Sequence, residues 1–318
     1  MTLSTDNPDI QPLLPRLAAS DAGVRRIALM ALADLGDPDS LPWLVQAVAS
    51  DPSASVRAEA AALLEAWDEP EVVHALCVAL TDAEPAVAQA AAHSLAQLKS
   101  HEAGRVLLPW AEHPVAFVRA SALRALRELR LPESAAPALL ALADTDPGIR
   151  REAVGILGWL RHAPALQAIA LRLREDPDLE VRRAAAGALG FASTDDVQRA
   201  LLAGLQDPAW AVREEAATTL GKVGDLGSAT ALTQALADEY WQVRLRAARA
   251  LGRLKLHAAQ PALITLLGHS ISNLRKEAAL ALGELGDQAA MTALRGAAED
   301  QDPEVRKAVR IALAQLQS

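Results

Sequence analysis

A repeat of 31 or 32 residues runs through this chain of 318 residues and constrains its fold more than any other feature. Each copy has an apolar anchor, alanine four positions later in nine copies, and leucine eight positions later in all ten. The anchors are Val24, Val56, Val87, Val118, Ile149, Val181, Val212, Val243, Leu274 and Val305. Short units in register predict a solenoid, in which each unit packs only on its neighbours. We therefore expect one continuous domain over residues 1–318.

Composition predicts that the units are helical. Hydrophobic residues make up 51% of the chain but aromatic residues only 3%, so Ala, Leu and Val must form the core, as in closely packed helices. A second apolar segment precedes each anchor, for example at residues 40–49 and 197–205, and it is long enough for about three helical turns. The predicted fold is an all-α solenoid of about ten helical hairpins, each with a first helix, A, and a second helix, B, that carries the anchor.

Charge and hydropathy exclude several classes of function. The net charge of −9 disfavours general binding to nucleic acids or to acidic membranes, which both require a basic surface. No apolar run approaches the length of a membrane span, and the first residues do not resemble a targeting peptide. The single Cys77 lies in an apolar run and is expected to be a small buried side chain. We expect a cytoplasmic protein without a cofactor.

Acidic and basic residues recur at fixed distances from the anchors. Arg follows the anchor directly in nine copies. Asp stands five residues before it in seven copies, at Asp51, Asp82, Asp144, Asp176, Asp207, Asp238 and Asp300. We expect each Asp to cap helix B and to pair with the Arg of a neighbouring unit. Because the pattern recurs, it indicates a structural role and not catalysis.

The helical period separates two faces of helix B. Anchor positions 0, +4, +8 and +11 fall on one narrow stripe, which we expect to be buried, whereas +2, +6, +9 and +10 point the opposite way. Copies five to nine have Gly at +9, and Gly224 and Gly286 at +12 suit a helix end.

The unit D-P-x-x-x-V-R-x-x-A-A-x-A-L-G-x-x-G resembles a HEAT repeat of the phycobilisome-lyase-like family of bacteria, from about Asp9 to Ser318. The resemblance implies that the B helices line a concave, partner-binding surface. Members of this family include lyases that attach or remove bilins, as well as adaptors without known chemistry. Another HEAT-like enzyme, deoxyhypusine hydroxylase, uses four His-Glu pairs to bind iron. This chain has only His101-Glu102, so we expect no metal site.

Two neighbouring copies in the middle of the chain share an unusual set of inward positions: Arg, then Gly, then an aromatic ring. These candidate residues are Arg151, Gly155 and Trp159, and Arg183, Gly187 and Phe191. Gly within a helix costs about 1 kcal/mol relative to Ala, so Gly155 and Gly187 need an explanation. Either they form the floor of a groove that a partner approaches closely, or they allow close contact between neighbouring helices.

Further arginines at nearby positions would make the central groove locally positive and suited to an acidic peptide, a carboxylate or a phosphate. They are Arg124, Arg127, Arg246, Arg249 and Arg253. The alternative is a solvated face in which these arginines alternate with glutamates.

The sequence therefore predicts a non-catalytic protein-binding scaffold or assembly factor whose partner carries an acidic segment. The alternative is a lyase or chaperone for a bilin or another tetrapyrrole, in which Trp159 and Phe191 stack on the ring system and the arginines hold its propionates.

Overall fold

The computed structural model describes residues 3–224 and 226–317, and in these residues it contains α-helices and 3-10 helices but no strand. The all-α prediction is confirmed. The chain divides into two units, Met1–Leu160 and Arg161–Ser318, which are described separately. The single continuous domain stays a prediction. No helix among the described residues is both long and apolar enough to cross a membrane.

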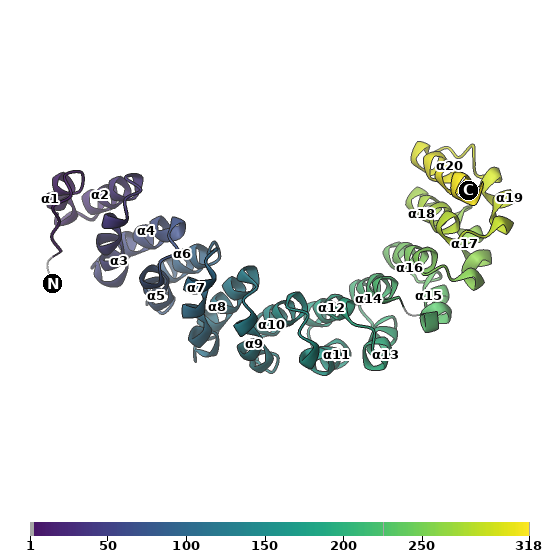
Figure 1. Cartoon of the computed structure of the whole chain (residues 1–318), viewed down its shortest axis with the longest axis horizontal. Coiled ribbons are helices and arrows are strands. Elements are labelled where there is room, and N and C mark those ends of the chain that lie inside the picture. Colours follow the sequence, from purple (N-terminus) through teal and green to yellow (C-terminus); the bar gives the residue numbers. More distant parts are fainter. Residues whose placement is uncertain (1–2, 225, 318) are drawn as a thin grey trace. The chain divides into compact units, whose positions relative to one another are not determined.

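Within each unit, A helices and B helices form two rows (Figure 1). The A helices are α1 (Leu14–Leu17), α3 (Leu41–Ser50), α5 (Pro70–Ala79), α7 (His101–Gly104), α9 (Ala135–Ala141), α11 (Leu166–Glu175), α13 (Asp195–Gly204), α15 (Ala229–Ala235), α17 (Gln260–Leu266) and α19 (Met291–Gly296). The B helices are α2 (Ala22–Asp34), α4 (Ala54–Leu63), α6 (Pro85–Leu95), α8 (Ala116–Leu129), α10 (Pro147–Trp159), α12 (Leu179–Ala188), α14 (Trp210–Val223), α16 (Trp241–Arg253), α18 (Ser272–Leu285) and α20 (Pro303–Gln317).

Short 3-10 helices extend many of these elements. In the first unit they are η1 (Gln11–Leu13), η2 (Pro38–Ser40), η3 (Leu64–Ala66), η4 (Arg105–Glu112) and η5 (Pro132–Ser134). In the second they are η6 (Ala163–Ala165), η7 (Leu189–Phe191), η8 (Leu226–Ser228), η9 (His257–Ala259) and η10 (Gln288–Ala290). The longest, η4, continues α7 and contains Pro109, which cannot donate a helical hydrogen bond.

The core follows the predicted register. Val181, Ala185 and Leu189, at positions 0, +4 and +8, are fully buried, and so is Ala186 at +5. Position +5 widens the predicted stripe because each B helix packs on its own A helix and also on the next B helix. Position +11 varies between copies and is 40% exposed at Leu35. Cys77 is buried as predicted, and burial raises the pKa of its thiol to about 12.

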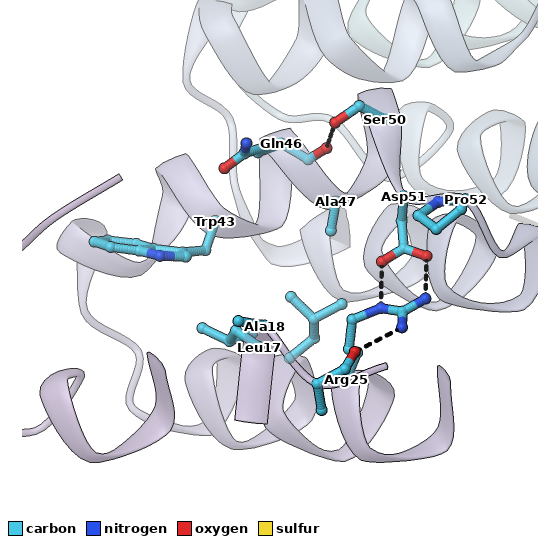
Figure 2. A pocket seen from close by; sticks show the side chains of 11 residues that line it. Leu17, Ala18, Arg25, Trp43, Gln46, Ala47, Ser50, Asp51 and Pro52 are labelled. Carbon is cyan, nitrogen blue, oxygen red and sulfur yellow. Dashed lines mark hydrogen bonds and ion pairs between the residues drawn. The ribbon is translucent and has the colours of Figure 1, made fainter. Parts of the chain in front are cut away.

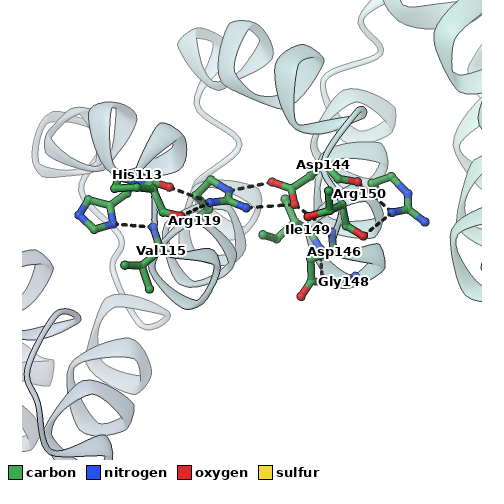
Figure 3. A network of polar contacts seen from close by, with 10 residues as sticks. His113, Val115, Arg119, Asp144, Asp146, Gly148, Ile149 and Arg150 are labelled. Atoms are coloured by element: carbon green, nitrogen blue, oxygen red, sulfur yellow. Dashed lines mark hydrogen bonds and ion pairs between the residues drawn. The ribbon is translucent and has the colours of Figure 1, made fainter.

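Arginine and aspartate side chains join successive repeats, as the sequence predicts. In each pair the Arg Nε donates to Asp Oδ2 of the next copy at 2.7 Å, and Nη2 donates to Oδ1. Nη1 donates to a backbone carbonyl of the Arg's own turn at 2.9 Å. The pairs are Arg25–Asp51, Arg57–Asp82, Arg119–Asp144, Arg182–Asp207, Arg213–Asp238 and Arg275–Asp300. Figure 3 shows Arg119 bound between the turn at His113 and the Asp144 carboxylate.

The expectation that this Asp caps helix B is wrong. Helix B begins two residues before the anchor, so the N-cap lies at −3, as at Ser53 for α4. The Asp at −5 instead accepts the N–H of that N-cap residue, for example Ser53 N to Asp51 Oδ1 at 2.9 Å. Each carboxylate thus closes its own turn and binds the preceding repeat.

His269 interrupts this pattern in the second unit. Its Nδ1 accepts the N–H of Ile271 at 3.0 Å, so the proton of the neutral ring lies on Nε2. That atom is 3.3 Å from Nη1 of Arg244, which is also a donor. The buried Nε of Arg244 has no hydrogen-bond partner among the described residues. The histidine therefore satisfies its own turn but not the arginine of the preceding repeat.

We expect His269→Asp to raise the free energy of unfolding by about 1.5 kcal/mol, because the carboxylate can accept both the Ile271 N–H and the Arg244 guanidinium. Urea unfolding followed by circular dichroism measures the change. His113 provides the matched control, because it occupies the same turn position but the preceding copy has Ala88 where other copies have Arg. His113→Asp should give no gain, and an equal gain at both positions would contradict the explanation.

The stability of the fold should also depend on pH. The hydrogen bond from Arg57 lowers the pKa of Asp82, and the bond from Arg275 lowers that of Asp300, from an ordinary value of 3.8. A carboxyl group whose pKa is lower in the folded state stabilises the fold above its unfolded pKa, and this contribution is lost as the pH falls through the folded pKa. We expect the free energy of unfolding to fall below about pH 4.

The variant Asp82→Asn tests the source of this effect. Asp82→Asn should lower the free energy of unfolding by about 1 to 3 kcal/mol at pH 7, because a charge-assisted pair is lost. The decrease should be much smaller at pH 3, where the carboxylate has already lost most of its stabilising contribution. A cost that stays equal at both pH values would show that the carboxylate charge contributes nothing.

Candidate binding surface on the B helices

The side chains at +6 and +10 of successive B helices stand on one exposed face. In α14 these are Thr218, which is half-buried, and Lys222, which is exposed. In α16 they are Arg249 and Arg253, both exposed. Within residues 161–318 the B helices form the inner row of the curve (Figure 1), so this face lies on the inner side of that unit.

Position +9 does not belong to this face in α14, α16 and α18, which corrects the expected set of inward positions. There the glycine at +9 is buried against the alanine at +7 of the next B helix, whereas Gly190, at +9 of copy six, is half-buried beside Thr219. A Cβ on Gly252 would lie 2.6 Å from Cα of Ala281, and one on Gly283 would lie 2.7 Å from Cα of Ala312. These glycines therefore allow the backbones of neighbouring B helices to approach. The two glycines at +12 end α14 and α18 with φ of 84° and 75°, as predicted for a helix terminus.

One half of the predicted central site lies on α10. Arg151 is exposed and Gly155 is half-buried, and a Cβ on Gly155 would lie 3.0 Å from Cδ of Arg127. Trp159 is 59% exposed, and the Arg130 guanidinium lies 4.2 Å from its ring centroid. The cation holds an aromatic ring on the surface in a defined position.

The other half lies on α12 and η7 in the second unit. Arg183 is 3.7 Å from Glu180, and a Cβ on Gly187 would lie 3.0 Å from Oε1 of Glu215. Phe191 is half-buried at the end of η7. Both unusual glycines thus lie beside a long side chain of a neighbouring B helix. Because the two halves belong to different units, the combined six-residue site stays a prediction.

Arg124 and Arg127 are held by a carboxylate. Arg127 Nη1 donates to Glu152 Oε2 at 2.7 Å, and Arg124 Nε is 3.6 Å from Oε1 of the same side chain, which is 3% exposed. Arg127 also pairs with Glu128 at 2.8 Å. Part of the predicted positive charge is therefore neutralised in the first unit.

The other three predicted arginines line one hollow of about 180 Å³ between α14 and α16. Arg246, Arg249 and Arg253 contribute one wall, and Thr218, Gly221 and Lys222 the other. Lys222 was missed by the sequence analysis. The available signal was its position: it stands at +10, as Trp159, Phe191 and Arg253 do.

A second hollow, of about 360 Å³, lies near the start of the chain. Figure 2 shows Trp43 at one end and the Arg25–Asp51 pair at the other, with Leu17 and Ala18 along the wall between them. The sequence did not indicate this hollow, because Trp43 recurs at this repeat position in no other copy.

The His101-Glu102 pair opens the short helix α7, where both residues are exposed. Across the described part of the chain, no three His, Cys, Asp or Glu side chains are grouped so that they could hold a metal ion.

The family model described as "HEAT repeats" matches residues 10–61, 41–127, 105–190, 166–244 and 229–314. Among solved structures, the fold is similar to yeast importin-beta (Kap95p), with a TM-score of 0.65 and 15% identity over 96% of this chain and 50% of that one. An engineered protein is also similar, with a TM-score of 0.57 and 21% identity over 98% and 99% of the two chains. At these identities the similarities show the fold alone.

One curated relative matches about half of the sequence. Phycocyanobilin lyase subunit alpha of Picosynechococcus sp. is 30% identical over 168 residues, which cover 52% of this chain and 55% of the relative. The match therefore spans about half the length of each protein.

The close contact between Gly252 and Ala281 can be tested by substitution. We expect Gly252→Ala to lower the free energy of unfolding by about 1 to 3 kcal/mol, because the new methyl group meets backbone that must move away. Gly296 in α19 is the control, since a Cβ there has nothing within 4 Å. Gly296→Ala should be neutral or stabilising by about 0.5 kcal/mol. Thermal unfolding of both variants compares them, and a neutral Gly252→Ala would contradict the close packing.

Proposed function

Since the chain belongs to the HEAT-repeat family, we propose that it is a non-catalytic, cytoplasmic scaffold or assembly factor that binds protein partners through the exposed face of its B helices. The binding residues are those predicted from the sequence: Arg124, Arg127, Arg151, Gly155, Trp159, Arg183, Gly187, Phe191, Arg246, Arg249 and Arg253.

Trp159 is the observation that carries this proposal. A tryptophan that is 59% exposed leaves a large apolar ring in water, whereas the anchors of the same helices are buried. Tryptophan and arginine are the residues that most often dominate binding energy at protein interfaces. The guanidinium of Arg130 lies over the ring and favours this position of the indole, which reduces the ordering cost of binding.

The similarity to phycocyanobilin lyase subunit alpha favours one alternative, a bilin lyase or chaperone. In that role Trp159 and Phe191 would stack on the tetrapyrrole, and the neighbouring arginines would pair with its propionates. The alternative differs from the scaffold in a visible property, because a bound bilin or haem absorbs visible light and a protein partner does not.

An affinity pull-down from the native lysate tests both proposals. The bait is compared with the variant Arg151→Glu, Trp159→Ala, Arg183→Glu and Phe191→Ala. The control variant, Leu140→Ala, Arg199→Glu and Arg295→Glu, reverses two charges on A helices instead. Circular dichroism checks that all three proteins are folded.

For a scaffold, we expect one partner to be recovered by the intact protein and by the control but lost by at least tenfold in the B-helix variant. Equal recovery by all three baits would contradict binding through these residues. A visible absorbance band on the intact bait and the control, without a protein partner, would instead support the bilin alternative.

A further inference from the structure

The hollow between α14 and α16 combines close backbone contact with long cationic side chains. Gly221 at its base packs on the next helix, and a Cβ there would lie 3.0 Å from Cβ and 3.1 Å from Cα of Ala250. Because the two helices touch at these small residues, the longer side chains at +6 and +10 stand on either side of the contact. The result is a recess of about 180 Å³.

Positive charge exceeds negative charge around this recess. Two of its arginines are bound by glutamates: Arg249 donates to both Glu277 oxygens, at 2.8 and 2.7 Å, and Arg246 Nε donates to Glu214 Oε1 at 3.0 Å. The other two cations, Lys222 and Arg253, make no hydrogen bond or ion pair with any residue that the structure describes.

A third carboxyl group lies nearby, on α18. The pKa of Glu284 is raised, first by burial and then by the charge of Glu277, although Arg249 and Arg253 act in the opposite direction. Even with all three carboxylates ionised, four cations leave one positive charge in excess. Glu214 and Glu277 also hold the side chains of Arg246 and Arg249 in place, so a ligand does not have to order these two arginines.

We propose that this recess binds a carboxylate side chain from a short acidic segment of a protein partner. The inference rests on the proposed scaffold function and specifies the chemistry that one part of the surface recognises. Arginine donates paired N–H groups to a carboxylate, and the unpaired Lys222 adds a mobile ammonium group. A volume of about 180 Å³ is below that of pockets for whole small ligands, which begin near 300 Å³, and therefore suits the end of a side chain.

The surroundings disfavour nucleic acid as the ligand. Glu214 lies on α14, and Glu277 and Glu284 lie on α18, so carboxylates stand on both sides of the cationic recess. A phosphate backbone carries charge continuously and would meet these carboxylates wherever it left the recess. A peptide can place one acidic group between neutral or basic residues.

Fluorescence anisotropy at low salt tests the proposal on the full chain. The probe is a short fluorescein-labelled peptide with glutamates flanked by Gly and Ser, and its counterpart has glutamine in place of every glutamate. The test variant is Lys222→Gln with Arg253→Gln, which breaks no ion pair and so leaves the fold intact. The matched control, Lys307→Gln with Arg310→Gln, removes the same charge from exposed positions of α20.

We expect the test variant to lose roughly tenfold or more in affinity for the glutamate peptide, the control less than twofold, and the glutamine peptide not to bind. Equal losses in both variants, or no binding by the intact protein, would overturn the proposal. A labelled single-stranded oligonucleotide that binds more tightly than the peptide would overturn it in favour of nucleic acid.

The outcome separates this inference from the proposed function. The pull-down variant retains Lys222 and Arg253. If that variant loses the partner while Lys222→Gln with Arg253→Gln binds the glutamate peptide as tightly as the intact protein, the proposed recess is refuted and the scaffold function is not. Peptide binding at the recess without any protein partner in lysate would refute the scaffold instead.

Discussion

The bidentate pair between Arg at +1 and Asp at −5 of the next copy is the interaction on which the repeat stack depends. Each carboxylate accepts two guanidinium N–H groups and one backbone N–H, and each guanidinium also binds its own turn. Both partners are largely removed from water, at 11% and 9% exposure for Arg25 and Asp51. A buried ion pair stabilises only when its remaining hydrogen-bonding groups are satisfied, and here nearly all of them are. The pair therefore fixes the distance between repeats at the turn end of the B helices.

Contacts between small residues fix the same distance farther along the B helices. Gly at +9 and Ala at +7 bring the backbones of α14, α16, α18 and α20 together in the second unit. Because neighbouring backbones touch there, the exposed side chains at +6 and +10 cannot fill the space between helices and must extend into solvent. The same packing that stabilises the unit thus leaves Lys222, Arg249, Arg253 and Glu284 exposed.

Positively and negatively charged side chains alternate on the exposed face of the B helices, and this arrangement limits which partners the face can bind. Carboxylates of neighbouring helices hold Arg127, Arg246 and Arg249, while Lys222, Arg253 and the ring of Trp159 remain available for binding. Such a surface suits a partner with mixed charge and an apolar anchor better than a uniformly charged polymer. The scaffold and the bilin alternative both use it. They differ in whether Trp159 and Phe191 cover a protein surface or a flat chromophore.

The sequence by itself determined the helical class, the register of the repeats, the Arg–Asp pairs and the glycine helix ends. The class and the register follow from a periodicity repeated ten times, and the pairs and helix ends follow from residues at fixed positions within that register. Only the tertiary structure showed that the +9 glycines of α14, α16 and α18 pack between helices and that Glu152 pairs with Arg124 and Arg127. It also showed that Lys222 and Arg253 line one hollow and that His269 lies beside Arg244. These features depend on the distance and rotation between neighbouring repeats. The spacing of residues within one repeat specifies which side of its helix a residue occupies, but not which long side chain of the next helix can reach it.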